Sequence, residues 1–173
     1  MKRTHFIILL VFLFIGGGFC ADFTLNHRFL PDDDGGIIDW RFNPAKQFQP
    51  LGKAECVMQN GQPGVKLTAT EAFCAIYAKN RISAKPGDKF SLTGMASGKG
   101  KIAIGFYMYS KGLWRGSLEK WFNVSEKNIP ISHDFEIKST VTDKDINYIT
   151  IMIMVKKPSE VTLSEFCCKK QIP

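Results

Sequence analysis

The chain has 173 residues, with 23 Lys or Arg against 16 Asp or Glu, and a formal net charge of +7. This length is typical of one domain with a substantial core. The densest basic runs are only Lys156-Lys157 and Lys169-Lys170, whereas a nucleic-acid-binding protein gathers Lys and Arg in a stripe or on one helix face. We therefore expect no nucleic-acid partner, and weak attraction to acidic polymers outside the cell is the alternative role for the charge.

The first residues have the layout of a signal peptide. Lys2 and Arg3 precede the apolar run Phe6–Ile15, which three glycines end. A membrane-spanning helix needs about 20 apolar residues, and this run is half as long. We expect no stable membrane span.

The small residues Gly18 and Cys20 suit cleavage by signal peptidase before Ala21. Cleavage divides the chain into a signal peptide, residues 1–20, and a single β-sandwich domain, residues 21–173, which carries 21 Lys or Arg against 16 Asp or Glu. The predicted location is secreted, periplasmic or at the cell surface. A lipid anchor at Cys20 is the alternative, although a large residue stands before it where lipoprotein signals have a small one.

Turn-forming residues interrupt the mature sequence about every ten residues, which is typical of an all-β sandwich or barrel. The turns are expected at Asn60–Gly64, Pro86–Asp88, Gly98–Gly100, Lys111-Gly112, Asp143–Asp145 and Lys157-Pro158. Strands are expected at Val65–Ala69, Phe73–Ala78, Lys89–Ala96, Lys101–Tyr109, His133–Val141, Asn147–Val155 and Glu160–Cys168. Helix is expected only as a turn or two around Ser117–Lys120, because no window sustains helical apolar spacing.

The strand over residues 102–109 has two different faces, since side chains alternate across a strand. One face, expected in the core, holds Ile102, Ile104, Phe106 and Met108. The other holds Ala103, Gly105, Tyr107 and Tyr109, which predicts a shallow trough that ends in aromatic rings. The strand over residues 147–155 is apolar on both faces, so it should be central and covered on both sides.

Four cysteines follow the signal peptide, an even number that permits disulfides in an exported chain. They are Cys56, Cys74, Cys167 and Cys168. If Cys56, residues 65–69 and Cys74 belong to three successive strands of a meander, two strand spacings separate Cys56 from Cys74. These two cysteines are then too far apart to form a disulfide. Any disulfide is then expected to join Cys167 or Cys168 to Cys56 or Cys74. The spacing matches no zinc site.

Several short segments, in order, are similar to one known family. They are Asn26 with Phe29, then Trp40, Val65–Leu67, Ile82–Leu92, Thr93–Ala96 and the closing strand Val161–Phe166. The chain resembles the jelly-roll, galactose-binding-like carbohydrate-binding modules that accompany secreted glycoside hydrolases. The resemblance implies a two-sheet antiparallel β-sandwich of jelly-roll topology, with the chain ends near one another.

Many modules of that family hold a structural calcium through acidic groups near the chain ends. Here Leu30 and Pro31 stand where the family has an acidic residue, and Asp32, Asp33 and Asp34 follow. These acids and Glu165 are the oxygen ligands available to calcium, but three successive acids are more often a solvated loop. We predict no cofactor, with structural calcium as the less favoured alternative.

No catalytic arrangement is recognisable. Glycoside hydrolysis needs two carboxylates held across a cleft, and nothing singles out such a pair. His27 and His133 lie in strand-like sequence without a nucleophile motif nearby. We therefore predict that the protein is not an enzyme.

Sugar binding depends on exposed rings that stack on pyranose faces, with a few polar groups that bond the hydroxyls. Trp40 is expected in the core, where a large ring in a strand is usually buried. The predicted ligand-binding residues are Tyr107, Tyr109, Trp114, Arg115 and Trp121. The expected partner is a polysaccharide or glycan. The alternative is an extracellular interaction or structural domain that binds another exported protein.

Overall fold

The protein is all-β. The structure, a computed structural model, describes residues 21–22, 28–43, 52–138 and 146–171. The strands are β1 (Ala21–Asp22), β2 (Trp40–Phe42), β3 (Gly52–Gln59), β4 (Gln62–Ala69), β5 (Phe73–Ala78), β6 (Ile82–Ser83), β7 (Lys89–Ser110), β8 (Leu113–Val124), β9 (Ile129–Glu136) and β10 (Tyr148–Gln171). Within these ranges there is no helix of the length and apolar character needed to cross a membrane.

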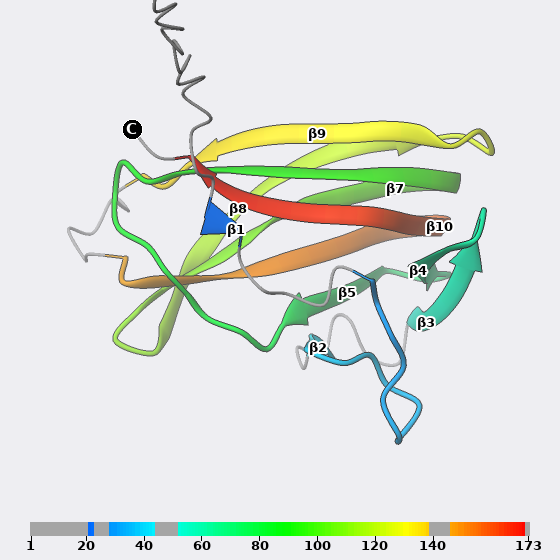
Figure 1. Cartoon of the computed structure of the whole chain (residues 1–173), viewed down its shortest axis with the longest axis horizontal. Coiled ribbons are helices and arrows are strands. Elements are labelled where there is room, and N and C mark those ends of the chain that lie inside the picture. The colour runs from blue at the N-terminus through cyan, green and yellow to red at the C-terminus, as the bar shows by residue number, and fades with distance from the viewer. Residues whose placement is uncertain (1–20, 23–27, 44–51, 139–145, 172–173) are drawn as a thin grey trace, which may run out of the picture.

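The strands form two packed layers, and β7 and β10 each belong to both (Figure 1). In one layer, the β8 sheet, the first half of β10 and the second half of β7 lie between β5 and β8, with β2 at the edge beside β5. In the other layer, the β9 sheet, the remaining halves of β10 and β7 lie between β4 and β9, with β3 at the edge. This is the predicted antiparallel sandwich.

The ends of the described chain meet in the β9 sheet. Ala21 pairs with Lys170, and Asp22 pairs with Lys169. This pairing agrees with the expectation that the chain ends lie near one another. The predicted signal peptide, Asn26, His27 and the predicted turn at 143–145 lie outside the described residues.

Two predicted turns are corners within continuous strands. The strands expected at 89–96 and 101–109 are one strand, β7, and those at 147–155 and 160–168 are one strand, β10. Gly100 has a φ of +116°, and a Cβ there would overlap the side chain of Ser159. The Ser159 hydroxyl accepts a hydrogen bond from the Lys101 amide at 3.0 Å and donates one to the Lys156 carbonyl. The two strands therefore bend together and cross from one sheet to the other.

Two other predicted turns are true hairpins. Asn60-Gly61 joins β3 to β4, and Lys111-Gly112 joins β7 to β8, with φ positive at both residues of each pair. Positive φ at both central residues is the type I′ geometry that suits the twist of a hairpin. The helix expected at residues 117–120 is wrong, because they pair with β7 in the middle of β8. The strand expected at 133–141 begins earlier, at Ile129, and residues 139–141 lie outside the described part.

The core between the sheets is built as the sequence predicts. The four side chains of β7 that were expected in the core, Ile102, Ile104, Phe106 and Met108, are buried. Met152 and Met154, on the outer side of β10, are buried as well. Trp40 is 3% exposed, and its ring lies 5.3 Å from that of Phe29 and 6.2 Å from that of Phe166 between ring centroids.

The structure contradicts the predicted disulfide and the meander behind it. Cys56, Cys74, Cys167 and Cys168 are all free thiols. The chain leaves the β9 sheet after β4 and enters the β8 sheet at β5, so these strands are not neighbours. Cys74 instead packs across the core against β3, and its thiol donates to the Lys53 carbonyl at 3.4 Å.

Candidate functional site

The outer face of the β8 sheet carries a group of aromatic rings over a floor of small or flexible apolar side chains. Ala75, Ala103, Met152 and Met154 form the buried floor. The rings, which we call the aromatic face, are Phe73, Tyr77, Tyr107, Tyr109, Trp114, Trp121 and Tyr148. Trp114 is exposed and the others are partly buried, so each ring offers only part of its surface to a ligand.

The sequence places Ala103, Gly105, Tyr107 and Tyr109 on this side of β7, and the structure agrees. A Cβ at Gly105 would overlap the carbonyl oxygen of Leu118 in β8. Only glycine allows β8 to pass this close, which keeps the centre of the face free of a side chain. No side chain therefore rises from this position of β7.

Tyr107 and Tyr77 form the middle of the aromatic face. Their ring centroids are 6.4 Å apart at an interplanar angle of 63°. The Tyr107 hydroxyl accepts a hydrogen bond of 2.7 Å from the Asn43 side-chain amide. Burial raises the pKa of Tyr107, and burial likewise raises the pKa of Tyr109. Both hydroxyls therefore stay protonated at neutral pH and can exchange hydrogen bonds with a neutral ligand.

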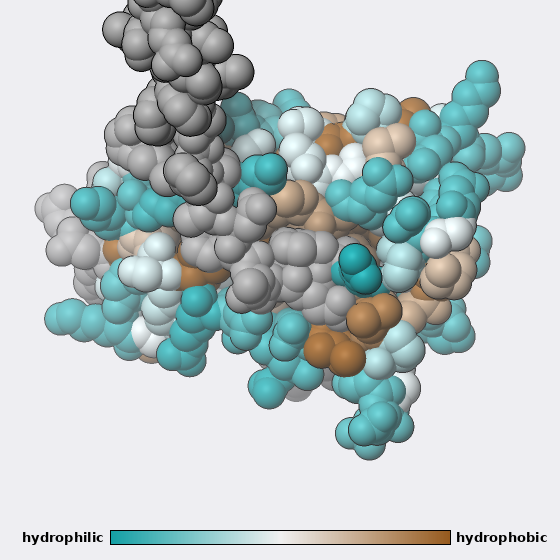
Figure 2. Space-filling model, viewed as in Figure 1, coloured by the Kyte–Doolittle hydropathy of each residue, from teal (hydrophilic) through white to brown (hydrophobic). Residues whose placement is uncertain are grey.

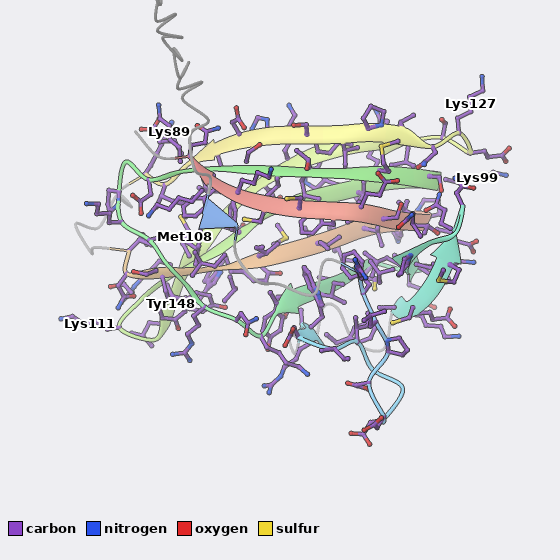
Figure 3. The ribbon with its side chains drawn as sticks, viewed as in Figure 1. Lys89, Lys99, Met108, Lys111, Lys127 and Tyr148 are labelled. Carbon is purple, nitrogen blue, oxygen red and sulfur yellow. The ribbon has the colours of Figure 1, made fainter. Side chains whose placement is uncertain are left out.

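One end of the aromatic face is a stack of rings at the tip of the β7–β8 hairpin. Tyr109 and Tyr148 lie 4.8 Å apart at 9°, and the Arg81 guanidinium lies 4.7 Å from the Tyr148 ring centroid. Trp114 pairs with Tyr109 in register and is 61% exposed. Figure 3 shows Tyr148 and the turn residue Lys111 together at one end of the molecule, opposite Lys99.

The other end is built around Trp121, which pairs with Ala103 in register. Its ring centroid lies 6.4 Å from that of Phe73. The indole Nε1 donates to Oε1 of Glu119 at 3.0 Å, and the Ser117 hydroxyl donates to Oε2 at 3.3 Å. These bonds fix the Glu119 carboxylate beside the ring.

Arg115 is the predicted site residue whose surroundings differ most from the expectation. Only Lys111-Gly112 form the turn, and Arg115 lies in β8 at a bulge opposite Met108 and Tyr109. Its Nε is buried and makes no hydrogen bond to a described residue. The structure therefore brings Tyr107, Tyr109, Trp114 and Trp121 to one face and sets Arg115 out of register with them.

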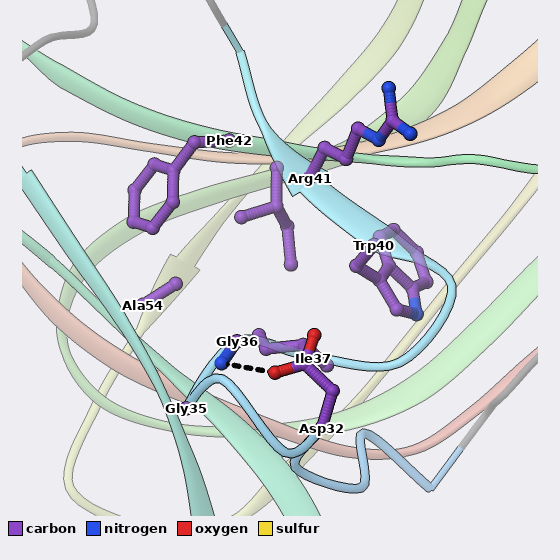
Figure 4. A pocket seen from close by; sticks show the side chains of 9 residues that line it. Asp32, Gly35, Gly36, Ile37, Trp40, Arg41, Phe42 and Ala54 are labelled. Atoms are coloured by element: carbon purple, nitrogen blue, oxygen red, sulfur yellow. Dashed lines mark hydrogen bonds between the residues drawn. The ribbon is translucent and has the colours of Figure 1, made fainter.

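A concave site away from the aromatic face lies at the open edge of the sandwich between β2 and β3 (Figure 4). It has a volume of about 260 Å³ and is lined mainly by apolar groups, including Ile37, Trp40, Phe42 and Ala54. Its carboxylate, Asp32, already accepts a hydrogen bond of 2.5 Å from the Gly36 amide. Figure 2 shows hydrophobic surface beside the loop that precedes β2. Residue 42 offers no sequence signal for such a pocket, since it is one aromatic in a short strand.

The comparisons with known proteins give a fold. No known family model matches the sequence, and no curated protein matches it. The family 11 carbohydrate-binding module of Clostridium thermocellum, in complex with a β-1,3-1,4-mixed-linked tetrasaccharide, matches with a TM-score of 0.55 and 12% identity over 80% of this chain and 92% of that chain. TmCBM61 in complex with β-1,4-galactotriose matches with a TM-score of 0.50 and 12% identity over 85% of this chain and 97% of that one.

This chain has the jelly-roll fold of carbohydrate-binding modules. The same jelly roll matches part of the enzymatically active domain of bacteriophage CBA120 tailspike protein 4, with a TM-score of 0.60 and 10% identity. That match covers 82% of this chain and only 20% of the tailspike chain.

The part of this jelly roll's aromatic face that comes from β5 and β10 is not predicted from the sequence. Phe73, Tyr77 and Tyr148 reach it only because β10 pairs with β5 on one side and β7 on the other. A signal is present in β5, where Phe73, Ala75 and Tyr77 repeat the alternation of small and aromatic residues seen in β7.

The acidic residues of the jelly roll do not assemble a metal site in the part that the structure describes. No group of three or more His, Cys, Asp or Glu is placed there to hold a metal ion. Asp32 has one carboxylate oxygen engaged by Gly36, as described above.

Proposed function

We propose that this protein is an exported, non-catalytic module that binds carbohydrate on the aromatic face. The observation that carries the proposal is the set of partly exposed rings, with Trp114 the most exposed, over a floor of small or flexible apolar side chains. A pyranose ring has apolar C–H groups on its faces and hydroxyls around its rim. Sites that suit such ligands combine apolar contact area with a few placed polar groups.

The polar groups at the edges of the rings match that requirement. The Asn43 amide and the Tyr107 hydroxyl lie in the middle, and the Glu119 carboxylate lies beside Trp121. Their separation across the face, from β2 to β8, would suit several sugar units of an extended chain better than one monosaccharide.

The fold supports carbohydrate binding without naming the sugar. Structures that share the fold have been solved with galactotriose and with a mixed-linked tetrasaccharide. Because one fold carries these different ligands, the specificity must come from the side chains of the face.

The remaining parts of the proposal rest on other observations. Export is supported by the N-terminal basic and apolar segment and the small residues at positions 18 and 20. A non-catalytic role is supported by the composition of the aromatic face. In the register of the described strands, Glu119 is the one carboxylate on this face. Acid–base hydrolysis of a glycoside requires two.

A second candidate function is binding to another exported protein at the edge pocket. Leu30, Ile38 and Phe42 are exposed large apolar residues of the loop and strand that form this pocket. Contiguous apolar surface favours a protein partner, whereas separated rings with polar groups favour a sugar.

Electrophoresis of the protein through gels that contain single polysaccharides tests the proposal. Retardation by at least one polysaccharide is expected, and Trp114→Ala should reduce it. The matched control is Phe42→Ala, which removes an exposed ring at the edge pocket and should leave retardation unchanged. If Phe42→Ala abolishes binding and Trp114→Ala does not, the site is the edge pocket. If no polysaccharide retards the protein, the proposed function is wrong.

A further inference from the structure

Two lysines lie side by side on the aromatic face. Lys101 in β7 and Lys156 in β10 are partners in register, and both are exposed. They are on the aromatic side of the sheet, because they continue the alternation of Ala103 and Met154. Like charges directly opposite one another on neighbouring strands are destabilising, so this pair costs the free protein stability.

Some of the described lysines are paired with carboxylates, and three such pairs lie on or near the neighbouring strands. Lys53 lies 2.7 Å from Glu55, Lys66 lies 2.7 Å from Glu160, and Lys99 lies 2.9 Å from Glu126. Lys99 is only two residues from Lys101. Among the described residues, neither Lys101 nor Lys156 has such a carboxylate partner.

The two ammonium groups border a pair of rings. Phe73 is the register partner of Lys156, and its ring lies 6.4 Å from that of Trp121. Asn123 is the partner of Lys101 on the other side. Neighbouring strands are about 4.8 Å apart, so both ammonium groups can reach one anionic group on a sugar that stacks against these rings.

Cations also predominate over the rest of the face. Arg41 is the register partner of Tyr77, and the Arg81 guanidinium lies against Tyr148. The carboxylate that the register places among them is Glu119, which already accepts hydrogen bonds from Trp121 and Ser117. The described part of the face thus has four cationic side chains, those of Lys101, Lys156, Arg41 and Arg81. Its one carboxylate, Glu119, already accepts two hydrogen bonds.

We infer that the glycan bound by the aromatic face is acidic, with its carboxylate or sulfate groups held by Lys101 and Lys156. The inference rests on the proposed function and specifies its ligand class. Rings supply the contact with the sugar, and the lysine pair supplies selection for charge. Anion binding also removes the repulsion between the two lysines, which favours the charged ligand over a neutral one of the same shape.

The test compares charged polymers with matched neutral ones in affinity gels. Polygalacturonate is set beside its methyl-esterified form, and a sulfated galactan is set beside its desulfated form. We expect the protein to bind one charged polymer at least about tenfold more tightly than its neutral counterpart at low salt, with the preference falling as salt screens the contact. A preference within the polygalacturonate pair identifies carboxylate as the anion, and a preference within the galactan pair identifies sulfate.

Matched variants separate the lysine pair from bulk charge. The double variant Lys101→Gln, Lys156→Gln should lose most of the charge preference and keep the residual binding to the neutral polymer. The control Lys53→Gln, Lys66→Gln removes the same charge from the β9 sheet and should keep the preference. Equal loss in both variants overturns the inference, because it would assign the attraction to net charge.

Failure of the inference and failure of the proposed function give different results. Equal or tighter binding of the neutral polymers, abolished by Trp114→Ala, overturns the acidic ligand and leaves the carbohydrate-binding face in place. Absence of binding to every polymer, charged or neutral, overturns both.

Discussion

Two tryptophans of this chain have opposite environments, and replacing each by alanine separates the core from the face. Trp40 is 3% exposed between Phe29 and Phe166, whereas Trp114 is 61% exposed beside Tyr109. The same atoms are removed in both variants. We expect Trp40→Ala to reduce the free energy of unfolding and Trp114→Ala to reduce glycan affinity.

The size of each effect follows from the area that each ring buries. A fully buried tryptophan removes about 200 Å² from water, which is worth about 5 kcal/mol at 25 cal/mol per Å². Since Trp40 is almost fully buried, its loss should cost about 3–5 kcal/mol, the usual range for such a cavity. With 61% of Trp114 exposed, the same reasoning gives at most about 2 kcal/mol as an upper bound for its loss. We expect about 1 kcal/mol.

The assays are denaturation in guanidinium chloride, followed by fluorescence, and affinity electrophoresis. Trp114→Ala should weaken glycan binding by about 1–3 kcal/mol, the range for a large ring lost from a contact, and lower the denaturation midpoint much less than Trp40→Ala does. If Trp114→Ala destabilises the protein as much as Trp40→Ala does, the ring is part of the core. A near-neutral Trp40→Ala would refute the packing described here.

Three further predictions concern the scaffold. Gly100→Ala should cost at least about 2 kcal/mol in unfolding free energy, because its φ of +116° and the overlap of a Cβ with β10 leave no room for a side chain. Burial disfavours ionised Asp88, but hydrogen bonds from Lys170 and the Lys85 amide outweigh it and lower the pKa of Asp88. Asp88→Asn should therefore cost about 1 kcal/mol at neutral pH, and the difference should vanish as the pH falls below about 3.9 and through the folded-state pKa. Burial raises the pKa of the Cys74 thiol to about 11 and that of Cys168 to about 12, so iodoacetamide at pH 8 should modify both only as fast as the protein unfolds.

Each of these predictions has a control. Gly112 also has positive φ but has open space around its Cα, so Gly112→Ala should cost less than Gly100→Ala, and equal costs would contradict the corner packing. Lys170→Gln should reproduce the pH-dependent loss of Asp88→Asn, since both remove the 2.8 Å ion pair. Rapid alkylation of Cys74 in the folded protein would contradict its place in the core.

The sequence was sufficient for local features and insufficient for pairing. The alternation from Ile102 to Tyr109 predicts both faces of one strand, because adjacent residues of a strand always point to opposite sides. It does not reveal that Met154 lies opposite Ala103, since two residues 51 positions apart come together only through the topology. The aromatic face was therefore predicted from its β7 and β8 residues and missed on β5 and β10.

Gly98–Gly100 and Lys157-Pro158 show why the sequence predicts turns where the structure has corners. Glycine and proline interrupt a strand pattern in the same way whether the chain reverses or bends. The decision depends on the next partner: β7 continues past Gly100 in the same direction and changes neighbours from β9 to β8. No local rule contains that information. The cysteine prediction failed for the same reason, because it assumed that Cys56 and Cys74 belonged to one sheet.

The sharing of β7 and β10 between the sheets also determines how the chain reaches its fold. β10 lies last among the described strands, yet it occupies the centre of both sheets, where β4, β5 and β7 pair with it. During synthesis neither sheet has its middle strand until Tyr148–Gln171 has left the ribosome. Before that point the earlier described strands can pair only with one another, as in β3 with β4 and β7 with β8 and β9. We therefore expect full protection from proteolysis only once β10 has joined them.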